Sequence, residues 1–315
     1  MFALRCVDVS LAFFVALYCL LSCLVTRSWK PVAGGMRRFS PRFAANMLFG
    51  LRIAPFFLAA SVTAIFVLPS FVLLEPRTVS EHLGETPLAL SACCLAFLIV
   101  GIHSAVKAQS ITQQAVALWL REATPIEPSD TVPVYRIRPA VPALTVAGVC
   151  LPKVLVSDAA AAMLTSQEMK TALRHEMAHV RHWDNLKKLI FRFTVFPGMT
   201  GLELAWSEYG EMAADDAAVT NAEDALDLAS ALIKLSRLVP SFPEAMLATA
   251  LVQGSRASIN ARVERLVAWQ EPEASAGPTL PWFVVPTGVG ACVALIASYS
   301  SVLMDMHKLT DWLVR

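Results

Sequence analysis

The sequence has few charged residues for its length. Of its 315 residues, 16% are Asp, Glu, Lys or Arg, 56% are hydrophobic, and the mean hydropathy is +0.56. A soluble globular chain carries about 25% charged residues. The composition therefore excludes a single soluble globule and favours a membrane protein with a soluble part. A formal net charge of +1 gives no sign of nucleic-acid binding, and we expect none.

The cysteines lack the spacing of a disulfide framework or of a thiolate metal site. Six of the seven lie in or beside apolar runs, and none forms a Cys-x-x-Cys pair near a histidine. This distribution favours small apolar side chains within spanning helices. The sequence also lacks internal repeats and low-complexity tracts.

Acidic residues are absent between Asp8 and Glu75, and this gap predicts a topology. Apolar runs at about 7–25, 53–74, 88–106 and 282–304 are each long enough to span a membrane. The loop between the first two runs is short and basic, so it should stay in the cytoplasm. The acidic loop 75–87 is then expected outside. The first run could instead be a signal peptide, but its length and the early Asp8 favour a retained span.

The spans divide the chain into three predicted parts. Residues 1–106 form three transmembrane helices, 107–281 a cytoplasmic domain with a C-terminal linker, and 282–315 the fourth span and a tail. Both termini would be extracytoplasmic. Within 107–281 the patterns predict helices at 109–121, 224–238 and 255–269, and strands at 133–138, 144–151 and 153–156. Residues 186–196 are expected to form a core or membrane-grazing helix.

One stretch carries a chemical signature, Arg-His-Glu-Met-Ala-His-Val-Arg-His-Trp-Asp-Asn at 174–185. His175 and His179 are four apart, so a helix presents both imidazoles on one face, with Glu176 about 100° round. Thr165 and Glu168 match a capping box, and no Gly or Pro interrupts 168–185. His-Glu-x-x-His on a helix is typical of zinc peptidases.

A catalytic zinc site needs a third protein ligand. One peptidase class places a third His six residues after the second, and Asn185 there excludes that class. His182 is an alternative. The other class takes a Glu from a later helix, and Glu211 stands in a helix-compatible run over 202–219. Asp215, one turn further, would orient a ligand histidine. The competitors of Glu211 for the role of third ligand are Glu203, Glu208 and Asp216. Two of them, Glu208 and Asp216, are better explained as residues of a solvated helix face.

The expected cofactor is one Zn²⁺ per chain. Zinc lowers the pKa of a bound water towards ~7 and polarises the scissile carbonyl. Glu176 would take a proton as general base and return one to the leaving amine. Tyr209 and His182 are both candidates for a substrate or oxyanion contact, and the sequence does not choose between them. An edge strand before the motif could hold an extended substrate by backbone pairing.

Several features together resemble the BlaR/MecR-type integral-membrane zinc peptidases, the antirepressor family of bacteria. The stretch 173–185 is similar to the family's His-Glu-x-x-His, basic stretch and Asp-Asn, and Phe196-Pro197, Trp206 and Glu211-x-x-x-Asp215 follow in the family's order. Three spans before the peptidase domain and one after it match the family's topology. The resemblance implies an α+β gluzincin-like domain between the third and fourth of four transmembrane helices. The implied site comprises the ligands His175, His179 and Glu211, the base Glu176, and supporting carboxylates at Asp215 and Asp184.

The chain departs from that family in two places. Ala214 stands where members often have Cys, and the sequence contains no counterpart of the penicillin-binding sensor domain that follows the last span in sensor-bearing members. We therefore do not expect β-lactam sensing within these residues. The expected partners are a protein substrate such as a transcriptional repressor, a separate sensor protein, and the lipid bilayer.

Two other functions compete with this interpretation. One is an HtpX-like quality-control or prenyl-protein-processing membrane peptidase, in which spans directly follow the motif, whereas 186–206 here is polar and broken. The other is a non-catalytic signal transducer or scaffold. A scaffold has no need of an intact His175, Glu176, His179 and Glu211, so these residues argue against it.

Overall fold

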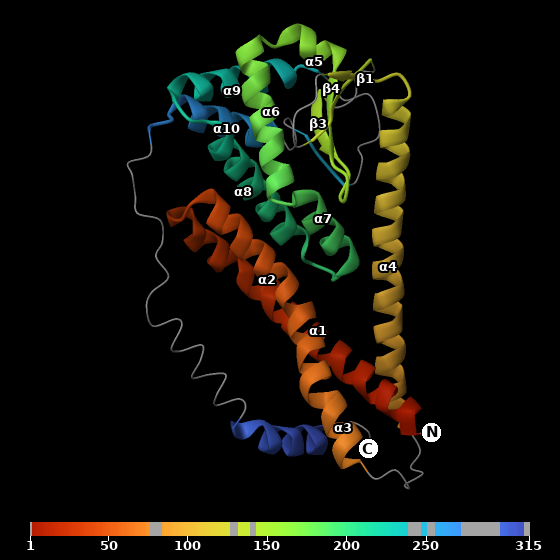
Figure 1. Cartoon of the computed structure of the whole chain (residues 1–315). Helices are drawn as coiled ribbons and strands as arrows, with labels where there is room; N and C mark the ends of the chain where they lie inside the picture. Colours follow the sequence, from red (N-terminus) through yellow and green to blue (C-terminus); the bar gives the residue numbers. More distant parts are fainter. Residues whose placement is uncertain are drawn as a thin grey trace. The chain divides into compact units, whose positions relative to one another are not determined.

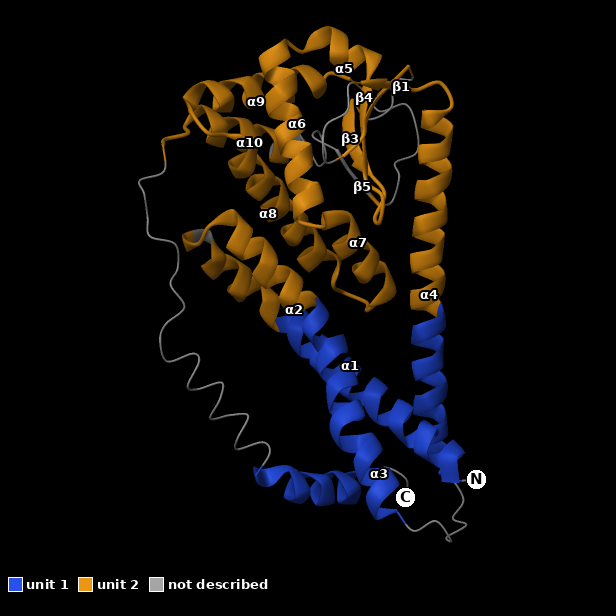
Figure 2. Ribbon diagram, in the orientation of Figure 1, with its two compact units in different colours: residues 1–27, 53–99, 272–315 blue, residues 28–52, 100–271 orange. Residues whose placement is uncertain are grey.

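The computed structural model describes residues 2–75, 84–126, 132–138, 143–238, 247–250, 256–271 and 297–311, most of them helical (Figure 1). The chain divides into two compact units (Figure 2). Unit 1 comprises residues 1–27, 53–99 and 272–315, and unit 2 comprises residues 28–52 and 100–271. Residues 28–52, predicted as part of the basic loop between the first two spans, therefore group with the residues that carry the His-Glu-x-x-His motif.

Within the described residues, three apolar helical runs are long enough to cross a membrane, which supports membrane association. They are α1 (Phe2–Gly35), the run Pro41–Leu74, and α4 (Glu85–Leu120). The second run joins α2 (Pro41–Val62), the π-helical segment η2 (Thr63–Val67) and α3 (Leu68–Leu74), and the short η1 (Met36–Arg38) precedes it. The predicted spans at 7–25, 53–74 and 88–106 fall within these runs.

Helix α4 is longer than the sequence patterns suggested. A span at 88–106 and a separate helix at 109–121 were expected, but one helix covers both because no proline interrupts 88–120. The predicted fourth span, 282–304, and the linker at 270–281 fall mainly outside the described residues. The described part near the C-terminus, 297–311, is helical.

Unit 1 combines aromatic packing with polar contacts. Tyr18 of α1 lies 5.8 Å from Phe56 of α2 and 6.0 Å from Phe97 of α4, between ring centroids. Arg5 pairs with Glu75 at 3.3 Å. Buried charges in an apolar helical unit are expected to be paired in this way.

A five-stranded sheet lies in unit 2, in the order β1-β2-β4-β3-β5. Its strands are β1 (Thr124–Ile126), β2 (Val134–Ile137), β3 (Leu144–Ala147), β4 (Lys153–Ser157) and β5 (Ala248–Ala250). Among the strands that the structure describes, β2 and β4 pair in parallel and the other neighbours pair antiparallel. Strands β2, β3 and β4 correspond to the three predicted strands. β3 ends earlier than expected because Gly148, at φ +100°, begins the turn to β4.

The two faces of the sheet bury alternate residues of β2, β3 and β4, as pleated strands require. Val134, Val146, Val154 and Val156 belong to a core shared with α6 (Ser166–Arg181) and α9 (Ala222–Leu235). Ile137, Ala147 and Leu155 pack instead with Trp119 at the end of α4. The sheet thus separates the end of α4 from the helix that carries the motif.

The predicted capping box of α6 is confirmed. The Thr165 hydroxyl accepts a hydrogen bond from the Glu168 N–H, and the Glu168 carboxylate accepts one from the Thr165 N–H at 2.8 Å. Residues 168–185, although free of Gly and Pro, do not form one continuous helix. α6 ends at Arg181, Trp183 takes the left-handed conformation at φ 57°, and α7 (Asp184–Phe193) begins at the next residue.

The remaining helices follow the sequence patterns closely. α7, α8 (Thr200–Ala218), α9 and α10 (Arg256–Val267) correspond to the predicted helices at 186–196, 202–219, 224–238 and 255–269. The short α5 (Asp158–Met163) and the strands β1 and β5 were not expected. α6 packs against α8, α9 and β3, so it lies at the centre of unit 2.

The connection between α7 and α8 is held by the end of α2 that belongs to unit 2. Arg52, only 2% exposed, donates to the Thr194 carbonyl at 2.8 Å and to the Glu203 carboxylate at 2.9 Å. At Gly101 of α4 a Cβ atom would lie 2.2 Å from the Phe193 carbonyl oxygen, so only glycine permits this close approach. These contacts fix the two helices that follow the motif, and they occupy Glu203, one of the competing ligand candidates.

Candidate metal centre

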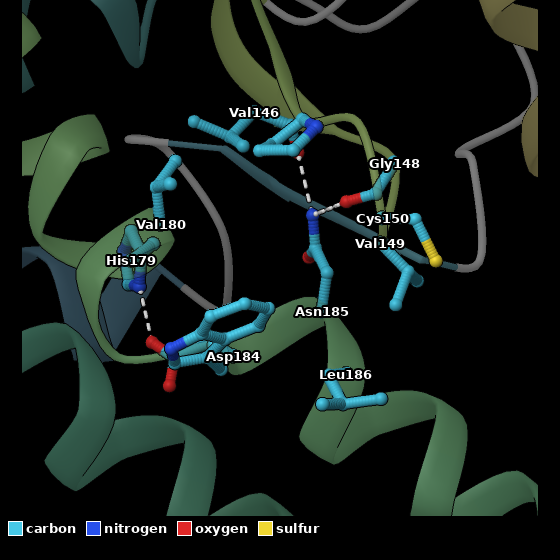
Figure 3. Close-up of a pocket in the computed structure, with 11 residues that line it drawn as sticks. Val146, Gly148, Val149, Cys150, His179, Val180, Asp184, Asn185 and Leu186 are labelled. Carbon is cyan, nitrogen blue, oxygen red and sulfur yellow. Dashed lines mark hydrogen bonds and ion pairs between the residues drawn. The ribbon is translucent and has the colours of Figure 1, made fainter. Parts of the chain in front are cut away.

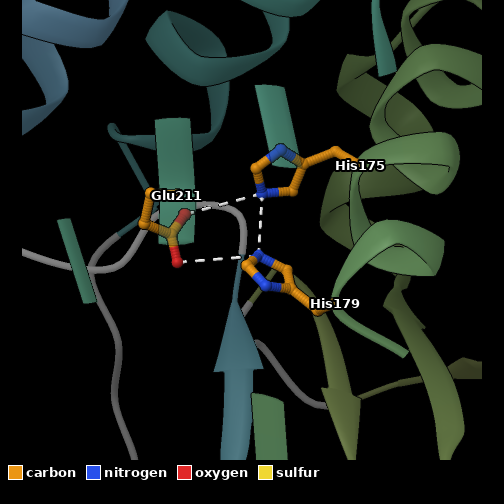
Figure 4. Close-up of side chains that lie close together, drawn as sticks. All are labelled: His175, His179 and Glu211. Carbon is orange, nitrogen blue, oxygen red and sulfur yellow. Dashed lines mark hydrogen bonds and ion pairs between the residues drawn. The ribbon is translucent and has the colours of Figure 1, made fainter. Parts of the chain in front are cut away.

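Three side chains of the metal-ligand type converge inside unit 2 (Figure 4). The ligand atoms of His175, His179 and Glu211 all lie within 4.8 Å of one another, and all three residues are buried. The two Nε2 atoms are 3.2 Å apart. The Glu211 oxygens lie 3.5 Å from His175 Nε2 and 3.6 Å from His179 Nε2. Two turns of α6 and one position on α8 therefore place three donors around one point.

Carboxylates behind the histidines fix the direction of both rings. Asp215 lies 3.0 Å from His175 Nδ1, and Asp184 lies 2.7 Å from His179 Nδ1. An ionised carboxylate only accepts hydrogen bonds, so Nδ1 of His179 carries the proton and its Nε2 is left as an acceptor towards the centre. The charge of Asp215 beside Nδ1 of His175 favours the same arrangement there. The left-handed turn at Trp183 brings Asp184 back to His179, five residues earlier in the chain. Asp215 and Asp184 stand where the sequence had placed supporting carboxylates.

Glu176 lies beside the cluster and has no exposed surface. Neither of its carboxylate oxygens has a hydrogen-bond partner among the described residues. Burial raises the pKa of Glu176 to about 8. His175 and Arg262 oppose this shift, and Glu211 adds to it. A buried carboxyl group without partners is costly to the fold, which is typical of a group kept for chemistry.

A buried arginine completes the site, and sequence reasoning missed it. Arg262 of α10, 2% exposed, donates to both oxygens of Asp215 at 2.8 and 2.6 Å and lies 2.9 Å from Glu211 Oε2. Burial raises the pKa values of Glu211 and Asp215, but the guanidinium charge outweighs it, so both values are lowered. No motif marks Arg262 in the sequence. Helix α10 also carries Arg265, which pairs with the exposed Asp216, and the sequence pattern does not distinguish the two arginines.

The electrostatics of the cluster favour a positive charge at its centre. Burial lowers the pKa of His175, yet hydrogen bonding to Asp215 and Glu211 outweighs burial and raises it to about 9. The surrounding carboxylates therefore favour a positive charge at this point, which a divalent cation would supply. The buried His-His-Glu group thus fits a metal ion, while its ligand chemistry alone does not identify the metal.

The other predicted site residues lie outside this cluster. His182 is the C-cap of α6, and burial together with the Arg42 charge lowers its pKa. Tyr209 is half-buried on α8, and Glu208 and Asp216 are exposed, as a solvated face would be. Sequence reasoning named Trp206 only for its place in the chain. Its buried indole N–H has no acceptor among the described residues, and it lines a small cavity with His179 and Glu211.

Comparison of the chain with protein families found no matching family model, and comparison with curated proteins found no match. The function must therefore be argued from the residues of the site.

Proposed function

We propose that this chain is a membrane-bound, zinc-dependent endopeptidase of the gluzincin type. The observation that carries this proposal is the buried convergence of His175, His179 and Glu211 with Glu176 one residue from the first histidine. Two imidazoles and a carboxylate form a ligand set of catalytic zinc that leaves one position open to water or substrate. A purely structural zinc site would be closed by a fourth protein ligand.

Zinc bound by these three residues would act as a Lewis acid towards a peptide carbonyl. Glu176 would hold a proton taken from the attacking water and deliver it to the leaving amine. Its lack of hydrogen-bond partners among the described residues leaves both oxygens available for that transfer. Asp215 and Asp184 keep the two rings oriented, and Arg262 neutralises part of the carboxylate charge. Exclusion of water around Glu176 strengthens each of these interactions.

The surroundings of the motif favour the BlaR/MecR-type resemblance over the HtpX-like alternative. The residues after the motif form α7, ten residues long and bearing Lys187, Lys188 and Arg192, which is too short and too charged to span a bilayer. We propose a regulatory protease in a bacterial inner membrane, with the site in the cytoplasm. Its substrate would be a cytoplasmic or membrane-adjacent protein, such as a transcriptional repressor, and a separate sensor would supply the signal.

Metal analysis combined with terminal proteomics tests this function. Full-length wild type and Glu176→Gln are purified in detergent, and both are expected to retain one zinc per chain. The same two proteins are expressed at equal levels in the host, and new protein termini are compared. Termini that require Glu176 would support the peptidase and name the substrate. A cleaved repressor supports the regulatory function, and cleaved misassembled membrane proteins support quality control instead. Absence of zinc from the wild type would contradict the proposal.

A further inference from the structure

A cavity of about 90 Å³ lies beside the candidate metal centre (Figure 3). This is the volume of roughly three water molecules in the liquid. His179 is part of its wall, and the β3–β4 turn and the start of α7 supply most of the rest. The lining is largely apolar, with contributions from Val146, Val149, Pro152, Val180, Trp183 and Leu186. Of the three candidate ligands, His179 lines this space, so the cavity adjoins the centre through that residue.

Trp183 is unfavourable for the fold on two accounts. It is the one non-glycine residue at positive φ in the described parts of the chain, at φ 57° and ψ 35°. It follows the C-cap of α6, where glycine is the usual residue because a Cβ atom clashes in this conformation. Its side chain is also 62% exposed. The turn itself is needed to bring Asp184 to His179, but glycine would make the same turn, so the indole requires another explanation.

Asn185 supplies the polar part of the wall. Its Nδ2 donates to the carbonyls of Gly148 at 2.9 Å and Val146 at 3.3 Å, which fixes α7 to β3. Its buried Oδ1 has no donor among the described residues. The carboxylate of Asp184 is already bonded to His179 and Lys187. A charged occupant would lose its hydration and find no free charged partner among the described lining residues, since Asp184 is already paired, so the lining favours an uncharged, apolar group.

We propose that this cavity is the subsite for an uncharged aliphatic side chain next to the cleaved bond of the substrate, and that Trp183 is its specificity-determining residue. This inference rests on the proposed function, because the occupant is part of a polypeptide held at the metal centre. Trp183 covers the side chain that enters, and the strained turn places the indole beside His179. The apolar walls disfavour acidic and basic side chains at this position.

Two hydroxamates that differ in one side chain test the subsite. Leucine hydroxamate and glycine hydroxamate both chelate zinc, and only the first carries an isobutyl group. Their affinities for zinc-loaded, full-length protein in detergent are measured by isothermal titration calorimetry. We expect the wild type to bind leucine hydroxamate roughly tenfold more tightly than glycine hydroxamate. Glutamate hydroxamate should bind no better than the glycine compound.

Substitutions of Trp183 separate the subsite from the strain of the turn. Trp183→Gly should bring the leucine-to-glycine affinity ratio to about 2 or below, since the covering ring is lost. Its glycine hydroxamate affinity should be unchanged, and its unfolding temperature equal or higher, because glycine relieves the left-handed strain. Trp183→Ala should lose the preference without gaining stability, and Trp183→Phe should retain most of the preference. Leu151→Ala, an exposed residue of the same turn outside the cavity lining, should leave the ratio unchanged.

The outcomes distinguish this inference from the proposed function. A wild-type ratio near one, or an unchanged ratio in Trp183→Gly, overturns the subsite and leaves the metal centre standing. Weaker binding of glycine hydroxamate to Trp183→Gly would show that the indole supports the centre itself, and would overturn its specificity role. Failure of both hydroxamates to bind zinc-loaded wild type contradicts the peptidase proposal, and the subsite with it.

Discussion

The two halves of helix α6 each bury a glutamate, but the two carboxylates differ in their hydrogen bonding. Near its start, Glu168 is 4% exposed and fully paired, accepting hydrogen bonds from Lys234 at 2.7 Å, from the Ser230 hydroxyl and from the Thr165 N–H. Two turns later, Glu176 has no exposed surface and no hydrogen-bond partner among the described residues. The same side chain on the same helix is thus anchored at one position and left unpaired at the other.

This difference separates a stabilising role from a reactive one. Hydrogen bonds to a buried charge stabilise the fold and fix the side chain. An unpaired buried carboxyl group destabilises the fold, and its pKa moves towards the range where it can exchange a proton at neutral pH. The N-terminal half of α6 is therefore expected to determine stability, and the C-terminal half to determine chemistry. Four measurements would test that division.

The largest effect is expected for Glu176→Gln. If Glu176 is the general base, as proposed, its removal should lower the rate of substrate cleavage by about 10²–10⁴-fold. The unfolding temperature of the metal-free protein should stay equal or rise, because a neutral amide is less costly to bury than an unpaired carboxylate. Cleavage of the substrate found by terminal proteomics gives the rate, and thermal unfolding in detergent gives the stability. A variant that loses stability and activity in parallel would make Glu176 structural and remove the contrast with Glu168.

The next effect is expected for Arg262→Gln. Loss of the guanidinium that holds Asp215 and Glu211 should weaken zinc binding by about 10–100-fold, as for other residues that orient metal ligands. Competition with a chromogenic chelator measures the affinity. Arg265→Gln is the matched control, since it removes an arginine of the same helix that pairs at the surface, and it should bind zinc like the wild type. Equal affinities for the two variants would exclude Arg262 from the centre.

A smaller effect, on stability alone, is expected for Glu168→Gln. This change weakens the capping box and removes the charged partner of Lys234, so the free energy of unfolding should fall by about 1–3 kcal/mol. Zinc affinity should not change. Chemical denaturation measures the stability, with Glu264→Gln on the exposed side of α10 as control. Loss of zinc binding in Glu168→Gln would show that the two halves of α6 are coupled and would break the division drawn above.

The smallest effects are pH dependences of opposite sign in the metal-free protein. Burial raises the pKa of Glu168, but hydrogen bonds from Lys234 and Ser230 outweigh it and lower the value from 4.5 to about 2. The advantage of wild type over Glu168→Gln should be full above pH 4.5 and disappear as the pH falls towards 2. Burial raises the pKa of Glu176 to about 8, so the wild type should lose stability relative to Glu176→Gln as the pH rises from 4.5 through 8. Denaturation across pH 3–9 at constant salt measures both trends, and parallel trends would contradict the comparison.

Local patterns predicted much of this site because they act over one or two helical turns. The capping box at Thr165 and the four-residue spacing of His175 and His179 follow from helix geometry alone. The convergence of Glu211 with them was expected from a helical run at a suitable distance along the chain. The break at Trp183 could not be predicted, because a tryptophan in the left-handed conformation runs against residue preference, and tertiary contacts must maintain it.

Long-range contacts account for what sequence reasoning missed. Arg262 meets Asp215 across 47 positions, and nothing in the pattern of α10 distinguishes it from Arg265. Strand β5 is three residues long, and its pairing with β3 depends on chain segments about 100 residues apart. A strand of three residues has too weak a local sequence preference to be predicted without the strand it pairs with.

Arg52 has a consequence for the order in which the protein is made. Thr194 is translated 142 residues after Arg52, and Glu203 is translated 151 residues after it. The connection between α7 and α8 can therefore take its final form only after both the α2 segment and residues 194–203 have been made. A shortened chain that begins at residue 107 would lack Arg52, and Thr194 and Glu203 would lose these contacts.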